Sequence, residues 1–253
     1  MSHFIYADHA ATTAVSDTAL QAMLPHFTTA YGNPSSLYRF AQEGKTDLER
    51  ARAEIAACLN ARPEEIYFTS GGTEADNWAL RGVAELMALK GRKGGHIITS
   101  AIEHHAVLHT AQYLEKQGYE VTYLPVDGRG LVDPAALEGA IRPDTILISI
   151  MAANNEIGTI EPVAELGHIA RAHKVLFHTD AVQAVGHIPV DVAAWNVDLL
   201  SLSAHKFRGP KGGGALYVKK PLRLPALIQG GGQEKDGEDR ECALFHKGSF
   251  KMR

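Results

Sequence analysis

Short apolar runs alternate with segments of helical periodicity over most of this sequence. The apolar runs predict strands at residues 65–69, 96–100, 119–126, 145–151, 175–179, 197–203 and 214–218. Helical spacing predicts helices at residues 73–90, 106–117, 134–141 and 162–173. This alternation is typical of an α/β protein with helices on both faces of a mostly parallel, multi-stranded sheet. The last strand follows its neighbour too closely for a helical crossover, so we expect antiparallel pairing or an irregular crossing.

An arm and two helices are expected before the first strand. Residues 3–15 read as extended chain, and Ser16 is a suitable N-cap for a helix that runs to about Phe27. A loop at residues 32–36 leads to a longer helix that ends near Asn60.

The longer of these helices has an apolar side and a polar side. We expect Ile55 and Leu59 to face inward and Arg52 to face solvent. Cys58 is interpreted as a small buried side chain, because no basic neighbour that would make its thiol reactive is evident nearby.

Polar residues follow five of the predicted strands at the point where each strand ends. In parallel α/β sheets, ligands bind beyond the carboxyl ends of the strands, so these residues are candidates for a single site. They are residues 71–73, His104, residues 154–156, Asp180 and Lys206.

The run of Ser203, Ala204, His205 and Lys206 places a lysine at the end of a buried strand. Desolvation or a nearby cation lowers the pKa of a lysine and makes its amine a nucleophile. Taken alone, the run fits a solvated lysine at a polar strand end better than a nucleophile.

The turn at residues 70–74 opens a predicted helix and contains Gly71, Gly72 and Thr73. Backbone N–H groups at such a helix start can bind an anion, although a glycine-led helix cap is the simpler alternative. Asp180 could cap a helix or hold a proton on a pyridine nitrogen. A lysine, an aspartate and a phosphate-binding turn together describe a site for pyridoxal phosphate.

His105 and His109 are four residues apart on a predicted helix, a spacing that can bind zinc. The H-E-x-x-H order is missing, and no third ligand is obvious in the sequence. We therefore expect no metal site.

Composition narrows the class of partner. The 253 residues carry a net charge of −4 and no long basic block, which argues against a nucleic-acid partner. No apolar stretch approaches the roughly 18 residues that span a bilayer, so we expect no membrane association. No signal-peptide core follows Met1, and Cys58 and Cys242 are the only cysteines, so we expect a cytoplasmic protein.

Several of these segments together resemble the cysteine desulfurases of the class V aminotransferase family, which are pyridoxal-phosphate transferases of fold type I. The segments that carry the resemblance are residues 8–13, 32–34, 68–77, 103–107, 154–158, 180–183 and 203–206. The resemblance runs from Ile5 to about Gly232. It implies an N-terminal arm at residues 1–15, a cofactor-binding large domain at residues 16–232 and an aberrant tail at residues 233–253. We expect this tail to be disordered, because it is highly charged at its start and has only a small apolar cluster.

The resemblance implies that Lys206 and His104 are catalytic. Lys206 would bond to the cofactor's aldehyde and then carry the Cα proton, and His104 would stack on the ring and take part in proton transfer. In the family's reaction, a cysteine thiolate attacks the sulfur of L-cysteine and leaves L-alanine and an enzyme persulfide. The sulfur then passes to an iron–sulfur cluster scaffold or a tRNA-thiolation enzyme, and the expected assembly is a homodimer.

The resemblance also implies a set of cofactor contacts. Asp180 would pair with the ring nitrogen, and Asn155 and Gln183 would approach the phenolic oxygen. Asn155 would also lie near the substrate carboxylate. The phosphate would be held by Gly72, Thr73, Ser203 and His205.

The sequence departs from the family pattern after Glu234. The family's Gly-Thr pair is absent, and so are the small C-terminal domain, its persulfide cysteine and its substrate-binding arginine. A frameshift or a premature stop near Glu234 would give this pattern, so we expect weak cofactor binding and little or no sulfide release. Cys242 stands among acidic residues that disfavour a thiolate, so we do not expect it to replace the missing nucleophile.

Two alternatives stay open at this point. A selenocysteine lyase or another class V aminotransferase would share these motifs, because the missing cysteine loop is the segment that discriminates. A non-catalytic, truncated fragment that binds the cofactor or only dimerises would also fit. The sequence leaves open whether a second polypeptide supplies the missing part and which sulfur acceptor is served.

Overall fold

The structure is a computed structural model that describes residues 5–228. Its strands are β1 (Ile66–Thr69), β2 (His96–Ser100), β3 (Glu120–Leu124), β4 (Thr145–Ser149), β5 (Leu176–Asp180), β6 (Leu199–Ser203) and β7 (Gly214–Val218). Its α-helices are α1 (Asp17–Thr28), α2 (Arg39–Cys58), α3 (Gly72–Leu89), α4 (His105–Lys116), α5 (Pro134–Ala140) and α6 (Val163–Ala172). Two short 3₁₀ helices, η1 (Pro63–Glu65) and η2 (Ala204–Lys206), precede β1 and follow β6.

Every strand and helix predicted from the sequence is present, and the ends differ by a few residues. Ser16 caps α1, since its hydroxyl accepts a hydrogen bond from the N–H of Ala19 at 3.2 Å. The predicted tail at residues 233–253 and Cys242 lie outside the described residues. Within residues 5–228, no helix is long and apolar enough to cross a bilayer.

The strands form one seven-stranded sheet in the order β1-β7-β6-β5-β4-β2-β3. The pairs β2–β3, β2–β4, β4–β5 and β5–β6 are parallel, and β7 runs antiparallel to both β6 and β1. The expected mostly parallel sheet and antiparallel last strand are therefore confirmed. Because β1 and β6 both oppose β7, β1 ends at the same edge of the sheet as the parallel strands.

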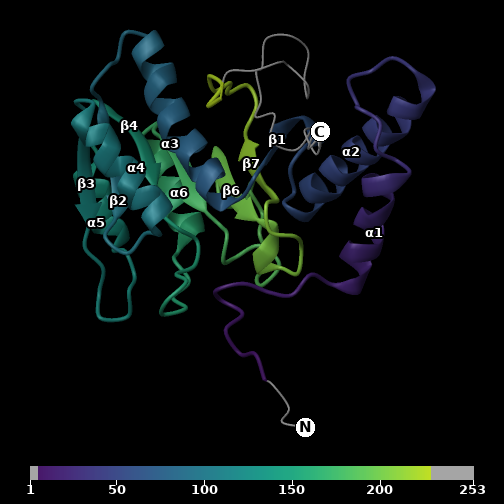
Figure 1. The fold of residues 1–253 in the computed structure, drawn as a ribbon. Helices are drawn as coiled ribbons and strands as arrows, with labels where there is room; N and C mark the ends of the chain where they lie inside the picture. Colours follow the sequence, from purple (N-terminus) through teal and green to yellow (C-terminus); the bar gives the residue numbers. More distant parts are fainter. Residues whose placement is uncertain (1–4, 229–253) are drawn as a thin grey trace.

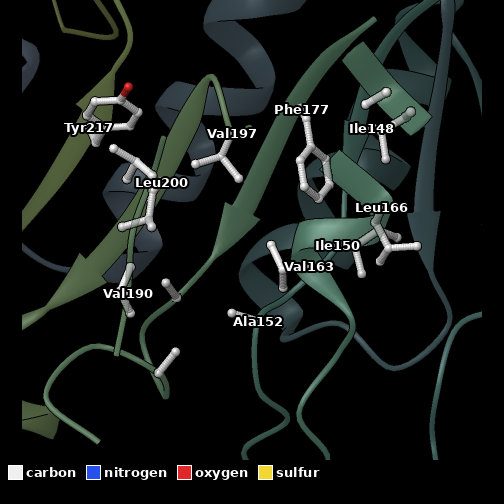
Figure 2. Close-up of a cluster of buried hydrophobic side chains, with 14 of the residues drawn as sticks. Ile148, Ile150, Ala152, Val163, Leu166, Phe177, Val190, Val197, Leu200 and Tyr217 are labelled. Atoms are coloured by element: carbon white, nitrogen blue, oxygen red, sulfur yellow. The ribbon is translucent and has the colours of Figure 1, made fainter. Parts of the chain in front are cut away.

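Helices cover both faces of the sheet, because successive side chains of a strand point to opposite sides. On β2, Ile97 packs with α3 and α4, whereas Ile98 packs with α5, α6 and the end of α2. Figure 1 shows these helices around the sheet. The apolar side chains thus form one cluster on each face of the sheet. Figure 2 shows the cluster that contains Ile98, in which Phe177, Leu166 and Leu200 are fully buried. The two clusters hold the strands rigidly and leave the strand ends free for other roles.

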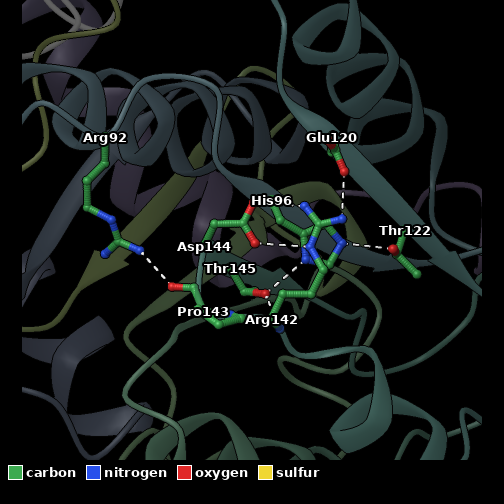
Figure 3. A network of polar contacts seen from close by, with 8 residues as sticks. All are labelled: Arg92, His96, Glu120, Thr122, Arg142, Pro143, Asp144 and Thr145. Carbon is green, nitrogen blue, oxygen red and sulfur yellow. Dashed lines mark hydrogen bonds and ion pairs between the residues drawn. The ribbon is translucent and has the colours of Figure 1, made fainter.

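A polar network joins the amino ends of β2, β3 and β4 (Figure 3). The ring of His96 contacts the hydroxyl groups of Thr145 and Thr122 at 2.9 and 2.8 Å. Arg142 donates to the carboxylate of Glu120 at 2.6 Å. Burial and the charge of Arg142 lower the pKa of His96, so a neutral ring bridges the strands. This network fixes the edge of the sheet opposite to the carboxyl ends.

Arg52 of α2 is buried, so the prediction that it faces solvent was wrong. Its side chain is 1% exposed, and its guanidinium donates to the backbone carbonyl of Ile66 in β1. The guanidinium carbon also lies 4.8 Å from the centroid of the Phe68 ring. A backbone acceptor and an aromatic face replace the water that a buried charge loses, and neither is visible in helical periodicity.

Cys58 is exposed, so the prediction that it is buried was also wrong. The buried face of α2 contains Arg52, Ala56 and Leu59, which are spaced four and three residues apart. Cys58 is two residues beyond Ala56 and therefore lies on the other side of the helix.

Replacing Arg52 with methionine tests this packing. Arg52→Met keeps most of the apolar stem but leaves the Ile66 carbonyl without its charged donor, and we expect the free energy of unfolding to fall by about 2 kcal/mol. The control, Arg50→Met, alters a side chain that is 67% exposed. We expect this control to change the free energy of unfolding by less than about 0.5 kcal/mol. Urea unfolding compares the two, and equal effects would show that Arg52 acts as a surface residue.

Candidate active site

A pocket of about 460 Å³ opens at the carboxyl edge of the sheet. The arm and the loops after β1, β2, β4, β5 and β6 contribute its lining. All the site residues predicted from the sequence line this pocket: Gly72, Thr73, His104, Asn155, Asp180, Gln183, Ser203, His205 and Lys206. The fold thus gathers in one place side chains that are spread over more than half of the sequence, while their individual roles remain predictions.

Lys206 ends η2, directly after β6. Its ammonium group donates to the backbone carbonyl oxygens of Ala10 and Ala11 in the arm. Partial burial lowers the pKa of Lys206, while the carboxylates of Asp180 and Asp8 act in the opposite direction. A lowered pKa increases the fraction of neutral amine, which is the nucleophilic form.

The arm is fixed across η2 by hydrogen bonds to both backbone and side chains. The N–H and hydroxyl of Thr13 donate to the carbonyl of His205 at 2.9 and 2.8 Å. The N–H of Arg208 donates to the Thr13 hydroxyl at 2.8 Å. The His205 ring contacts the Thr12 hydroxyl at 3.0 Å. Residues near the amino end therefore hold the segment that carries Lys206 in place.

The start of α3 has the character of an anion site. Helix α3 begins at Gly72, and no side chain of the described residues caps this end. A second pocket of about 420 Å³ adjoins it and is lined by Gly72, Thr73, Ser203, His205 and Lys211, among others. Free N–H groups, hydroxyls and a lysine around one cavity suit a phosphate group.

Gly72 is required sterically at this helix start. A Cβ atom there would lie 2.6 Å from a methyl group of Val182, on the loop that follows β5. The backbone of α3 can approach that loop only without a side chain at this position. The close approach brings the start of α3 next to Asp180, two residues before Val182.

Asp180 ends β5 and is 4% exposed. Its Oδ1 accepts a hydrogen bond from the N–H of Val182 at 2.9 Å. Burial raises the pKa of Asp180, and the Val182 N–H, His104 and Lys206 all act to lower it. A carboxylate in this position can hold a proton on a ring nitrogen, so the residues present fit pyridoxal phosphate at both its ring and its phosphate ends.

Three further predicted side chains already have partners. The Asn155 side chain donates to Glu156 at 2.8 Å, and that of Gln183 donates to the carbonyl of Ala10 at 2.8 Å. His104 caps α4, since its Nδ1 accepts from the N–H of Ala106 at 3.1 Å. That cap leaves Nε2 as the His104 nitrogen available for chemistry.

Two buried carboxyl groups at the site were given no role by the sequence analysis. Asp76 is 1% exposed and lines the larger pocket. Glu103 accepts from the Ser100 hydroxyl at 2.6 Å and from the N–H of Met151 at 2.9 Å, and burial raises its pKa to about 8. Asp76 lies three residues before Ala79 on the apolar side of α3, and this helical spacing is the signal that could have revealed it.

Among the described residues, no third ligand group lies beside the histidine pair on α4. The rings of His105 and His109 stack with their centroids 5.0 Å apart. Among residues 5–228, the place where three potential ligand side chains converge is instead Asp76, His104 and Asp180, whose nearest atoms all lie within 4.8 Å of one another.

Comparisons with known proteins agree with this geometry. The family described as aminotransferase class-V matches residues 5–251. The chain is 57% identical to the cysteine desulfurase IscS of Methanosarcina thermophila over 231 residues, which is 91% of this chain and 56% of that protein. It is 55% identical to the Clostridium botulinum (strain Kyoto) protein of the same name over 235 residues, or 93% of this chain and 58% of that one. The chain thus spans less than two thirds of these relatives.

Solved structures show the same relationship. The structure titled "SspA in complex with cysteine" is 42% identical with a TM-score of 0.88, and the match covers 93% of this chain and 67% of that one. A NifS-like protein is 44% identical with a TM-score of 0.89, covering 94% and 64%. The sheet and its helices are therefore the large domain of the pyridoxal-phosphate fold type I. The chain belongs to the class V aminotransferase family and, within it, is similar to the cysteine desulfurases.

Proposed function

We propose that this chain forms the cofactor-binding part of a cysteine desulfurase, which removes sulfur from L-cysteine and gives L-alanine and a persulfide. The observation that carries the proposal is the convergence of Lys206, Asp180 and the start of α3 on one pocket. The curated relatives are named cysteine desulfurases, and one similar structure is titled as a complex with cysteine. The family depends on pyridoxal phosphate.

The proposed cofactor contacts follow from the chemistry of the side chains. Pyridoxal phosphate, when bound, withdraws electrons from the α-carbon of an amino acid joined to it. Lys206 would hold its aldehyde end, Asp180 its ring nitrogen, and Asn155 and Gln183 its phenolic oxygen. The phosphate would be held by Gly72, Thr73, Ser203 and His205.

The proposed work of Lys206 and His104 is proton transfer and positioning. The amine of Lys206 would accept the Cα proton of the substrate at Nζ, and its lowered pKa leaves more of the amine neutral for this task. His104 would stack on the ring and present Nε2, because Nδ1 is occupied in capping α4. Asn155 is proposed to orient the substrate carboxylate.

The sulfur-accepting thiol must come from outside residues 5–228. The cysteine within them, Cys58, is exposed on α2 and does not line the pocket. Our expectation that Cys242 is not this nucleophile stays a prediction, because that residue lies outside the described part. We propose an iron–sulfur scaffold or a tRNA-thiolation enzyme as the later sulfur acceptor, and the cytoplasm as the compartment.

We also propose that the chain acts as a homodimer. No residue of α1 is buried, and large apolar side chains on and near α1 and α2 are exposed. They include Leu20, Leu24, Phe27, Tyr31 and Leu37. An apolar surface of this kind favours association with a second copy.

Covalent trapping tests the assignment of Lys206. After incubation with pyridoxal phosphate and reduction with borohydride, peptide mapping should find the pyridoxyl group on Lys206, because this lysine lines the pocket with Asp180 and the start of α3 and has a lowered pKa. Lys206→Ala should lose the label. Lys116→Ala, an exposed position at the end of α4, should keep it. A label on any other lysine in the unaltered chain would refute the assignment.

The pH dependence of cofactor capture should respond to Asp8. The Asp8 carboxylate raises the pKa of Lys206, so Asp8→Asn lowers that pKa further and increases the neutral amine. The rate of capture against pH, followed by the absorbance of the bound cofactor, should shift toward lower pH. We expect a modest shift, because solvent screens the exposed Asp8. Asp17→Asn, on the exposed side of α1, should leave the curve unchanged, and a shift toward higher pH would contradict the assigned interaction.

Exchange of the substrate Cα proton tests the function without requiring the sulfur-accepting thiol. In deuterated water, the cofactor-loaded chain should introduce deuterium at Cα of L-cysteine but not of D-cysteine, as read by proton NMR. Lys206→Ala should slow this exchange by at least about 10²-fold, since it removes the base. Lys116→Ala provides the matched control. Cofactor binding without exchange would favour the alternative of a non-catalytic fragment, and formation of a keto acid would favour an aminotransferase.

A further inference from the structure

Asp76 lies at the floor of the proposed cofactor pocket, on the inner side of α3. One of its carboxyl oxygens, one of those of Asp180 and a ring nitrogen of His104 all lie within 4.8 Å of one another. Its side chain is 1% exposed, and within residues 5–228 its Oδ1 has no hydrogen-bond partner. Two buried carboxylates this close cannot both be charged without a large energetic cost.

Ser201 and His178, the neighbours of Asp76 on the sheet, supply no positive charge to it. The Ser201 hydroxyl donates to the Asp76 carboxyl group. The His178 ring contacts the Ser201 and Ser149 hydroxyls at 3.0 and 2.8 Å, and burial lowers the pKa of His178 to about 3. Because Ser201 gives its one proton to Asp76, it accepts from Nε2–H of His178. Because its pKa is lowered so far, the ring is neutral, and its 3.7 Å separation from Asp76 is not an ion pair.

Asp76 and Asp180 differ in what favours their charged forms. Asp180 has the N–H of Val182 at 2.9 Å and lies near Lys206. Within the described chain, Asp76 accepts only the Ser201 hydroxyl, while burial, Asp180 and Glu103 act against its ionisation and raise its pKa well above the ordinary value. Burial raises the pKa of Asp180 as well, but three groups oppose that rise. A proton shared by the two carboxyl groups therefore resides on Asp76.

We propose that Asp76 is a positioning residue that carries the one proton of the Asp76–Asp180 pair and donates toward Asp180, so that Asp180 alone bears the negative charge for the cofactor's ring nitrogen. This inference rests on the proposed function. A donor to a carboxylate stabilises its charged form, so Asp180 leaves its proton on the ring nitrogen. The sequence of polar contacts from Ser149 through His178 and Ser201 fixes the orientation of Asp76.

The first test needs no cofactor. Infrared difference spectra between the unaltered chain and Asp76→Asn, at neutral pH, should show a protonated carboxyl band that belongs to Asp76. The matched control, Asp17→Asn, should show only loss of a carboxylate band. A carboxylate band alone in the Asp76→Asn difference would overturn the proposal, whether or not the chain binds pyridoxal phosphate.

The second test reads the ring nitrogen directly, with ¹⁵N-labelled pyridoxal phosphate and NMR. Asp76→Asn keeps a neutral donor and should retain the protonated nitrogen, whereas Asp76→Leu has no donor and should shift the signal toward the unprotonated form. Equal shifts in both variants would show that Asp76 acts as a charge, and no shift in Asp76→Leu would show a purely structural role. Either result overturns the proposal. If Asp76→Leu does not fold, the infrared measurement and Asp76→Asn decide. Failure of every variant and of the unaltered chain to bind the cofactor would instead refute the proposed function.

Discussion

The parallel pairing of β5 with β6 is the contact on which the candidate site depends. Its register places Asp180 opposite Ser201, so the loops that follow the two strands leave the same edge of the sheet. One loop then carries Lys206 on η2, and the other carries Val182 against the start of α3. The apolar clusters on both faces keep these strands in register, so the core determines the spacing of the chemistry.

Charge at this edge is arranged by burial more than by ion pairs. Lys206 is partly desolvated, which favours its neutral amine, while its charge and that of His104 act to lower the pKa of Asp180. Asp76 and Glu103 are buried carboxyl groups with raised pKa values, and no lysine or arginine of residues 5–228 pairs with either of them. The site therefore combines one favoured anion with neighbours that are kept neutral, an arrangement suited to holding a positively charged ring nitrogen.

The sequence was enough to predict the order of strands and helices and the residues that line the pocket. The signals for both are local: the spacing of apolar residues, glycine-containing turns and polar residues at strand ends. Arg52 and Cys58 were mispredicted because the direction of a helix face depends on what packs against it. Arg52 finds a carbonyl of β1 and the ring of Phe68, which are distant in sequence. Asp76 stood inside a recognised segment, but its importance depends on the nearness of Asp180, which only the folded chain shows.

A crystal structure of the full chain with pyridoxal phosphate tests the central claim most directly. The account predicts electron density joined to Nζ of Lys206, with the ring nitrogen beside Asp180 and the phosphate at Gly72 and Thr73. Density joined to another lysine, or a phosphate bound away from the start of α3, would contradict it.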